Sequence, residues 1–463
     1  YQVGTVWSDA LSEAEMKYAA DDVLYLHKLA ELQRERHKEL ELVDVMSLEM
    51  RFLPALVETV HNGVAIDHKR LIEVTSQVEV LVEEEKAKFF TLIQEETGEE
   101  LDASVINSPS ALKELFARSG LIVDSVDREV LEELKEHPAI DALLKYRTAN
   151  KYLSTYLYPY AEIGYFDEAG NYRVHPNYNQ NITDSGRLSC DNPNLQNVTV
   201  NTILLPNGEE FSLRELFIPI KGYKLLGGDL SQVELKLLAD LSQDPTLISI
   251  FEEDKDLHSI SAGFILGKAP ELVTPKERKQ NKAVTFGIVY GKTAFGLCKD
   301  LGVSFGAAFA KISNWFKGYP GAKRFIESKH REARKHGWVR TVLGRLRWMD
   351  DINHHEKWIR QRAENAAQNT PIQGTSADGM KETMALLWSQ LYADGTLDKV
   401  KLSIQVHDEL LVMFKGSEQY ARRLLKNSLQ RGTQKFCTCV TITVGNDENG
   451  FDVSVVPTWK QLK

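Results

Sequence analysis

Apolar and polar residues alternate on both sides of the dipeptide His407-Asp408. The apolar positions are Leu402, Ile404 and Val406 before it and Leu410, Val412 and Phe414 after it. A period of two that is interrupted by two polar residues predicts a tight β-hairpin. We expect Asp408 and Glu409 at its tip, although such turns favour Gly or Asn, which tolerate positive φ. A polar turn is the simple interpretation, but a turn that departs from the usual residues is also a candidate functional site.

A second apolar run, at residues 223–226, predicts a short buried strand. Two glycines follow, which we expect to end the strand, and Asp229 comes directly after them. Ser231 and Glu234 have the spacing of a capping box, so a helix is expected to begin there. On this stretch alone, Asp229 is most simply a turn residue and Glu234 a helix cap. If Asp229 lies beside Asp408, however, the two carboxylates repel each other unless a cation lies between them, and oxygen ligands favour Mg²⁺.

A predicted helix at residues 275–291 carries candidate ligands for a phosphoryl transfer, a reaction in which two metal ions can clamp the attacking and leaving oxygens. Thr274 and Glu277 form a capping box, with Pro275 at the first helical position. Four residues recur at every fourth position and therefore share one stripe of this helix. They are Arg278, Lys282, Phe286 and Tyr290. Two cations followed by two rings fit a nucleotide, but an ordinary helix with solvated cations and buried rings fits the pattern equally well.

Composition indicates an ordinary soluble chain of 463 residues, with 43% hydrophobic and 26% charged residues. No apolar run approaches the length of a membrane span, and the first residues are no signal peptide. We therefore expect an intracellular protein with no membrane partner, cytoplasmic if its source is bacterial or viral. The four cysteines are not spaced with histidines as zinc ligands, so we expect free thiols.

The net charge of −10 argues against a nucleic-acid partner, but the distribution of charge reverses that inference. Residues 268–347 hold 18 Lys and Arg against 5 Asp and Glu, a charge of +13 that leaves −23 for the remainder. Aromatic residues are interleaved with these cations. Clusters of Lys and Arg with interleaved aromatic residues are typical of surfaces that bind phosphates and stack nucleic-acid bases. A pair of basic surface helices has the same composition.

Together the three stretches resemble the three polymerase motifs of the family A DNA polymerases, the bacterial DNA polymerase I class. The first motif matches residues 229–236, the second 278–291 and the third 406–409. The resemblance implies an α+β right-hand polymerase fold with an antiparallel-sheet palm, helical fingers and a helical thumb. It places the thumb and its connecting helices at 41–160, the palm at 161–239 and 351–463, and the fingers at 240–350.

By this resemblance the chain is a DNA-directed DNA polymerase, a nucleotidyltransferase of DNA replication that extends a primer 3′ end. The catalytic residues would be Asp229, Asp408 and Glu409. Asp229, Asp408 and the backbone carbonyl of Leu230 would bind two Mg²⁺ ions, for which Mn²⁺ could substitute. The nucleotide-binding residues would be Gln232, Glu234, His258, Arg278, Lys282, Phe286 and Tyr290, with Glu234 blocking a 2′-hydroxyl. Family members with Phe at the position of Phe286 discriminate against dideoxynucleotides, whereas those with Tyr accept them.

The resemblance also implies a set of DNA contacts near the growing end. These DNA-binding residues are Arg187, Asn194, Gln196, Asn197, Asn369, Gln373 and His407. Donors in the minor groove test the shape of a base pair and not its sequence. The chain departs from the family at residues 198–201, where Val-Thr-Val-Asn replaces Ile-Pro-x-Arg, and at Asn365, where Arg is frequent. Lys236 and Leu230 replace an arginine and a tyrosine. The expected partners are primer–template DNA and deoxynucleoside triphosphates, and the protein is expected to be a monomer.

Residues 1–40 contain a further capping box, at Ser12 and Glu15, and a predicted helix. Within that helix Tyr18 and Asp22 lie on one face and resemble the last motif of the DEDD-type 3′–5′ exonucleases. We interpret 1–40 as the C-terminal remnant of such a domain, without enough carboxylates to hold a catalytic metal, and expect no exonuclease activity. Two rival hypotheses are a nuclease, which would lack ligands, and an inactive DNA-binding protein, which the two metal-binding acids disfavour.

Overall fold

The computed structural model describes residues 11–445 and 453–462 of the chain. Its centre is an antiparallel four-stranded sheet in the order β12-β13-β9-β14. The strands are β9 (Lys224–Asp229), β12 (Val400–Val406), β13 (Glu409–Phe414) and β14 (Ser454–Val456). β13 is buried at every position, because helices cover the sheet. The predicted hairpin and the predicted buried strand are therefore confirmed, and they pair with each other so that Asp229 lies opposite Glu409.

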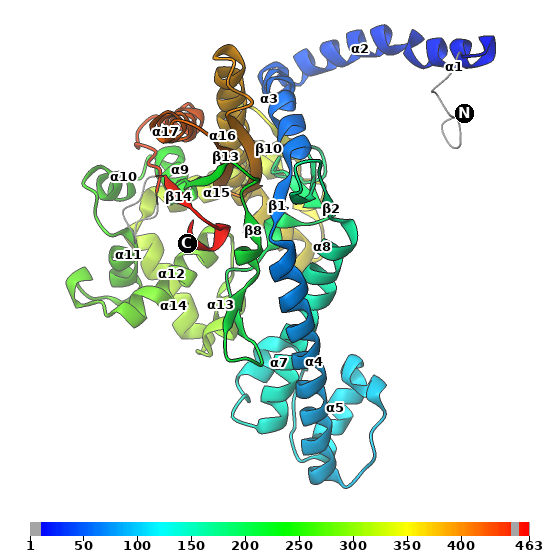
Figure 1. Cartoon of the computed structure of the whole chain (residues 1–463). Helices are drawn as coiled ribbons and strands as arrows, with labels where there is room; N and C mark the ends of the chain where they lie inside the picture. Colours follow the sequence, from blue (N-terminus) through cyan, green and yellow to red (C-terminus); the bar gives the residue numbers. More distant parts are fainter. Residues whose placement is uncertain (1–10, 446–452, 463) are drawn as a thin grey trace.

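Helices from distant parts of the chain pack around this sheet (Figure 1). They are α3 (Val43–Asn62), α9 (Val233–Ser242), α16 (Lys357–Ala393) and α17 (Glu418–Gln434). α16 is 37 residues long and packs against both α3 and α17. It connects the sheet to a helical lobe, which is formed by the part of the chain between α9 and α16.

That lobe corresponds to the predicted helical insertion and carries the stripe of cations and rings. Its helices are α10 (Pro245–Glu252), α11 (Leu257–Leu266), α12 (Pro275–Val289), α13 (Ala294–Leu301), α14 (Phe305–Gly318) and α15 (Pro320–His336), with the short turns η5 (Pro270–Leu272) and η6 (Asp350–Asn353). A hairpin of β10 (Trp338–Arg340) and β11 (Leu346–Trp348) follows α15. The predicted capping box of Thr274 and Glu277 is present at the start of α12.

Two helices extend away from the sheet as a packed pair, α4 (His68–Thr97) and α7 (Pro138–Tyr152) (Figure 1). Asp67 caps α4, and Gly98 ends it at φ +69°. A second helical stretch, residues 128–163, is interrupted before Pro138. Its other parts are α6 (Arg128–Glu132), the π-helical turn η2 (Leu153–Leu157) and α8 (Tyr158–Ile163), while η1 (Ala103–Asn107) and α5 (Pro109–Arg118) complete the tip.

Short strands connect this helix pair to the central sheet. Two of them, β2 (Tyr165–Phe166) and β3 (Tyr172–Val174), form a hairpin. The others are β1 (Val64–Ile66), β4 (Asn177–Asn179), β5 (Ser189–Asp191), β6 (Thr202–Leu204), β7 (Glu210–Ser212) and β8 (Phe217–Ile218). Three single turns, η3 (Leu195–Asn197), η4 (Leu213–Leu216) and η7 (Trp459–Leu462), lie near the ends of strands.

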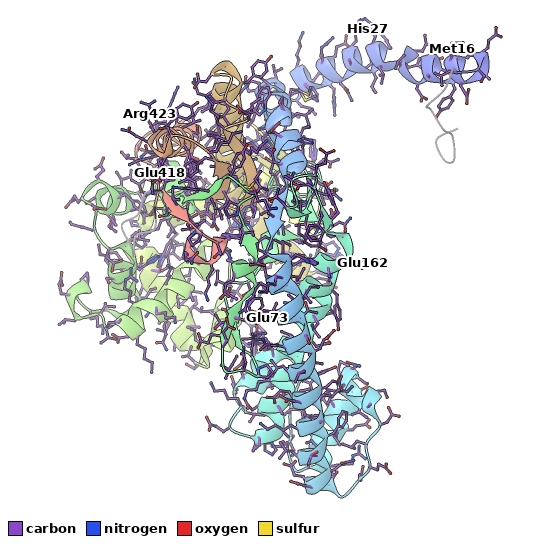
Figure 2. All side chains as sticks on the ribbon, in the orientation of Figure 1. Met16, His27, Glu73, Glu162, Glu418 and Arg423 are labelled. Atoms are coloured by element: carbon purple, nitrogen blue, oxygen red, sulfur yellow. The ribbon has the colours of Figure 1, made fainter. Side chains whose placement is uncertain are left out.

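The first two helices, α1 (Glu13–Leu24) and α2 (Leu26–Glu39), form an arm that leaves the rest of the molecule (Figure 1). The predicted capping box of Ser12 and Glu15 begins α1. Figure 2 shows the side chains of Met16 and His27 on this arm, away from the sheet and its helices. Neither helix has a buried residue.

Three local predictions around the sheet are wrong: where β9 ends, which residues form the hairpin turn, and how α9 begins. Gly227 and Gly228 do not end β9 but lie inside it, where a Cβ on Gly227 would strike Leu462 of η7 and one on Gly228 would strike Leu429 of α17. These glycines therefore permit close packing on the two faces of the sheet. The turn of the hairpin is His407-Asp408 and not Asp408-Glu409, with His407 at φ +54°.

The predicted capping box of Ser231 and Glu234 does not form. The N-cap of α9 is Gln232, in the left-handed conformation at φ +47°, and it makes no side-chain cap hydrogen bond. Glu234 is instead bound by residues from two other elements. Because these partners come from elsewhere in the fold, tertiary contacts prevail over the local pattern at this helix start.

Candidate nucleotidyl-transfer site

The two predicted metal-binding acids come together where β9 meets the turn before β13. The backbone N–H of Leu230 donates to the carbonyl oxygen of Asp408 at 3.1 Å, and Asp229 pairs with Glu409 across the strands. Residues paired in this way have Cβ atoms about 4.5–5.5 Å apart. Asp229 and Asp408 are both half-buried. The fold therefore brings two carboxylates from distant parts of the sequence to one edge of a buried sheet.

Side chains from neighbouring strands and loops hold the backbone of the His407-Asp408 turn. The amide of Gln405 donates to the carbonyl oxygen of His407 at 2.7 Å. The Tyr178 hydroxyl in turn accepts from the backbone N–H of Gln405 at 3.0 Å. A non-glycine residue at positive φ, such as His407, persists where its surroundings determine the conformation.

The donors at this edge suit a hard divalent cation. Asp229 and Asp408 offer carboxylate oxygens, and Leu230 offers a backbone carbonyl. Among the described residues there is no cluster of three or more His, Cys, Asp or Glu side chains that could enclose a metal. Mg²⁺ does not need such a cage, because it is usually held by one or two carboxylates, waters and substrate phosphates. The residues present fit that mode of binding.

Glu409, the third predicted catalytic acid, points into the protein core. Its Oε1 accepts a hydrogen bond from the indole Nε1 of Trp459 at 2.9 Å, and its Oε2 lies 3.4 Å from Nη1 of Arg214. All three side chains are buried. Arg214 and Trp459 were not predicted, since they lie far from the motifs along the chain.

The stripe of α12 lies alongside α11, which carries His258 and is capped by the carboxylate of Asp256. Arg278 donates to both carboxylate oxygens of Asp256, at 2.8 and 3.2 Å. Burial alone raises the pKa of Asp256, but the hydrogen bonds from Arg278 and Ser259 together have the larger effect and lower this pKa to about 2. The predicted phosphate ligand His258 is buried, and its ring centroid lies 6.1 Å from that of Phe286. Lys282 is half-buried between Arg278 and Phe286 on the stripe.

Glu234 connects the sheet edge to α12. One carboxylate oxygen accepts from the guanidinium of Arg187, and the other accepts from the hydroxyl of Tyr290, the residue that ends α12. Burial, and then the charge of Glu234, raises the pKa of Tyr290 well above its ordinary value. The ring of Tyr290 stacks on Phe286 with centroids 6.1 Å apart. The structure thus brings four predicted site residues from three elements into direct contact.

The remaining predicted DNA contacts lie around this cluster, and several support its backbone. Gln196 donates to Gln405 at 2.9 Å, and Asn369 donates to the carbonyl oxygen of Tyr290 at 3.0 Å. Asn194 caps η3, and the carbonyl oxygen of Asn197 accepts from Tyr156. Gln373 is half-buried on α16. Gln368 was not predicted as a site residue, and its amide donates to the last carbonyls of α12, at Val289 and Ile288.

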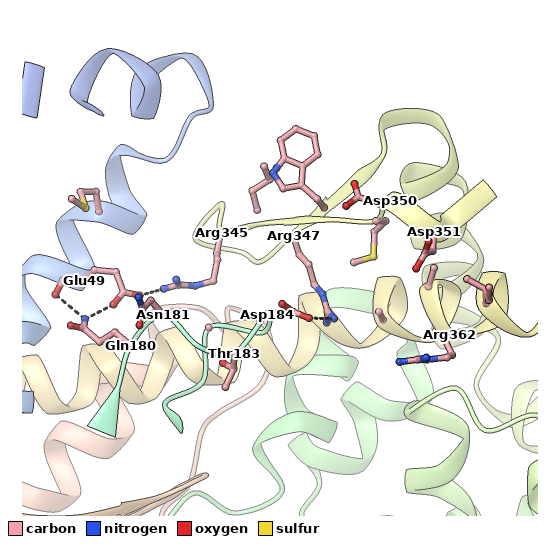
Figure 3. A pocket seen from close by; sticks show the side chains of 18 of the residues that line it. Glu49, Gln180, Asn181, Thr183, Asp184, Arg345, Arg347, Asp350, Asp351 and Arg362 are labelled. Carbon is pink, nitrogen blue, oxygen red and sulfur yellow. Dashed lines mark hydrogen bonds and ion pairs between the residues drawn. The ribbon is translucent and has the colours of Figure 1, made fainter. Parts of the chain in front are cut away.

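A cavity of about 910 Å³ opens beside Gly186, next to Arg187, and was not predicted (Figure 3). Residues of α3, α16 and β11 line it, together with the loop before β5. Arg347 donates to Asp184 at 2.8 Å, and Arg345 forms an ion pair with Glu49. Two cations of the cavity are therefore neutralised by carboxylates of the same wall, as the dashed lines in Figure 3 show.

Tyr18 and Asp22 both lie on α1, in the arm that extends from the molecule. Asp22 is exposed. The structure does not bring either residue near the sheet edge that holds Asp229 and Asp408.

Comparison with known proteins places the chain in a family. Residues 71–448 match the family model for DNA polymerase family A. The chain is 38% identical over 310 residues to the thermostable DNA polymerase I of Thermus caldophilus, covering 66% of this chain and 36% of that protein. It is 35% identical over 426 residues to DNA polymerase I of Streptococcus pneumoniae, covering 89% of this chain and 46% of that protein. The chain belongs to DNA polymerase family A, and it spans less than half the length of these two relatives.

A solved structure confirms the fold. The POL domain of Pol1 from M. smegmatis, in complex with DNA primer-template and dNTP, superposes with a TM-score of 0.81 at 26% identity. The match covers 95% of this chain and 78% of that one. The predicted α+β right-hand polymerase fold is therefore correct. In the part of the chain that the structure describes, no helix is both long and apolar enough to cross a membrane.

Proposed function

We propose that this chain is a template-directed DNA polymerase that adds deoxyribonucleotides to a primer 3′ end. The observation that carries the proposal is the hydrogen bond from Leu230 to Asp408, which brings the acid of β9 beside the acid of the hairpin. An antiparallel sheet edge is a rigid place for two carboxylates. Family membership and the primer-template and dNTP bound by the M. smegmatis relative support DNA and nucleotides as partners.

In this proposal Asp229, Asp408 and the carbonyl of Leu230 hold two Mg²⁺ ions, for which Mn²⁺ can substitute. When bound, the ions lower the pKa of the primer 3′-hydroxyl and neutralise the leaving pyrophosphate. The chain's own residues orient the groups that react. The carboxylates fix the position of positive charge, and the Gln405–His407 hydrogen bond keeps the turn from moving.

The α12 stripe receives the incoming nucleotide. Arg278, Lys282 and His258 face the triphosphate, Phe286 packs on the sugar, and Tyr290 borders the templating base. The ion pair with Asp256 keeps the guanidinium of Arg278 oriented before the nucleotide arrives. Arg278 then exchanges Asp256 for the phosphate. Gln232 lies at the start of α9, and Glu234 blocks a 2′-hydroxyl.

The duplex lies across Arg187, Asn194, Gln196 and Asn197 on one side and the residues of α16 on the other. Asn369, Gln373 and His407 complete the contacts at the growing end. The cations of 268–347 supply a phosphate-binding surface. We assign α4 and α7 to the thumb, α10–α15 to the fingers and the central sheet to the palm. The protein acts as a monomer inside the cell, without a 3′–5′ exonuclease site formed by Tyr18 and Asp22.

Primer extension by the purified chain with Mg²⁺ and all four deoxynucleotides tests the proposal. Asp229→Ala or Asp408→Ala is expected to abolish extension and to leave the Kd for primer–template within about tenfold, because phosphate contacts elsewhere dominate DNA affinity. Asp398→Ala is the matched control, since this acid lies outside the site in the turn before β12 and the charge change is the same. Extension by either site variant at the rate of the control would contradict the two-metal assignment.

A further inference from the structure

The buried cluster of Glu409, Arg214 and Trp459 lies directly behind the turn that carries Asp408. Their exposed fractions are 1%, 5% and 0%. Glu409 is the first residue of β13 and follows Asp408 in the chain. A buried carboxylate is costly unless it is paired and hydrogen-bonded. The contacts of Glu409 therefore decide where the start of β13, and with it the turn, can lie.

The two partners of Glu409 also hold each other. The guanidinium carbon of Arg214 lies 4.1 Å from the ring centroid of Trp459, a cation–π distance. Phe217 packs edge-on against the same indole at 5.3 Å. The indole is thus enclosed, and its N–H points at Glu409 with a donor–acceptor distance of 2.9 Å.

Trp459 belongs to η7, which follows β14 near the end of the described chain. β14 pairs with β9 on the side opposite β13, so it flanks the strand that ends at Asp229. Lys460 forms an ion pair with Glu215, which fastens η7 to η4, the turn that carries Arg214. The segment of β14 and η7 therefore contacts β9, the strand that ends at Asp229, and Glu409, the residue that follows Asp408.

We infer that Arg214 and Trp459 are positioning residues of the nucleotidyl-transfer site, and that they act through Glu409 to fix the turn bearing Asp408. This inference rests on the proposed function. An apolar cluster of the same volume would pack at least as well, because buried ion pairs contribute little net stability. The cluster instead sets one geometry for the hairpin. Glu409 accordingly serves as an anchor of the turn, with its carboxylate directed at Arg214 and Trp459.

Trp459→Phe is the decisive variant, since it removes the indole N–H and keeps an aromatic ring against Arg214. Trp315→Phe is its matched control. Trp315 is 0% exposed in α14 of the helical lobe, and within the described residues its Nε1 has no hydrogen-bond partner. Both substitutions remove similar buried volume, but one alone releases Glu409.

We expect Trp459→Phe to lower kcat for single-nucleotide extension by about ten- to a hundredfold, the effect of losing one hydrogen bond to a charged group. KM for the nucleotide should stay within about threefold, because α12 is untouched. The Mg²⁺ concentration for half-maximal rate should rise. A merely structural role would change Tm and leave this Mg²⁺ dependence alone. Trp315→Phe should leave kcat within about twofold and the Mg²⁺ dependence unchanged.

A double-mutant cycle tests whether Trp459 acts through Glu409. Glu409→Gln keeps an oxygen acceptor, and combined with Trp459→Phe it should cost less than the sum of the single changes. Arg214→Lys keeps the charge and loses the stacked plane, so it should reproduce the fall in kcat and carries the test if Trp459→Phe does not fold. If the wild-type protein extends primers, and Trp459→Phe and Trp315→Phe have the same kcat and the same Mg²⁺ dependence, the inference is overturned. An inactive wild-type protein would instead refute the proposed function, and the inference with it.

Discussion

Glu234 offers a sharp test, because its role changed between sequence and structure. The carboxylate is not a helix cap, and it accepts hydrogen bonds from Arg187 and Tyr290. Its side chain is 11% exposed, and that of Arg187 is 33% exposed. Glu234→Ala removes both contacts and opens space beside the ring of Tyr290. Glu234→Gln keeps the length of the side chain and an acceptor for Tyr290 but removes the charge.

The magnitude follows from the two contacts. A hydrogen bond to a buried charged group is worth about 1.5–3 kcal/mol, which applies to the Tyr290 hydroxyl. The ion pair with Arg187 is partly exposed and is worth about 0.5–1 kcal/mol. Glu234→Ala should therefore lower the free energy of unfolding by about 2–4 kcal/mol. If the carboxylate also excludes a 2′-hydroxyl, removing it should raise the relative use of ribonucleotides by about ten- to a hundredfold.

The assay measures kcat/KM for a ribonucleotide and the matching deoxyribonucleotide at one template position. Glu234→Gln should keep the ratio within about threefold, because the space stays filled. Tyr290→Phe removes the same hydrogen bond without opening the space, so it should lower stability and leave the ratio close to wild type. An unchanged ratio in Glu234→Ala would refute the sugar-gate role. If the ratio rises equally in Tyr290→Phe, selection against the 2′-hydroxyl depends on the placement of Tyr290 and not on the carboxylate.

Two further predictions concern residues outside this contact. Phe286→Tyr should raise dideoxynucleotide incorporation by about ten- to over a hundredfold, since the added hydroxyl can replace the missing 3′-hydroxyl as a partner of the phosphates. Competition of dTTP with ddTTP on one template measures this, and an unchanged ratio would mean that Phe286 does not face the sugar. The chain should release no mononucleotides from a mismatched 3′ end in Mg²⁺. Steady release that disappears in Asp22→Ala would establish an exonuclease site on α1.

Sequence rules succeeded where the structure is decided by residues close together in the chain. Capping boxes placed the starts of α1 and α12. Alternating apolar residues located β12 and β13. Each of these signals lies within one helix end or one hairpin, where the hydrogen bonds join residues close together in the chain.

The same rules failed where a distant segment decides the conformation. Gly227 and Gly228 have the sequence of a turn, but η7 and α17 press on them from opposite faces of β9. No periodic pattern in the sequence indicates that these glycines contact η7 and α17. A glycine in a strand therefore indicates either a turn or a close approach, and only the fold decides which.

The acids of the site show the limit most clearly. Glu234 binds partners 47 and 56 positions away, and Glu409 binds partners 195 and 50 positions away. The resemblance to the polymerase family implied a role for both residues, yet it could not state what either one touches. A buried carboxylate must find a donor, so the fold that buries it also selects that donor. For Glu234 the donors come from the loop before β5 and from the end of α12, and for Glu409 they come from η4 and η7. The role of each acid follows from its partners, and those partners exist only once the sheet has assembled.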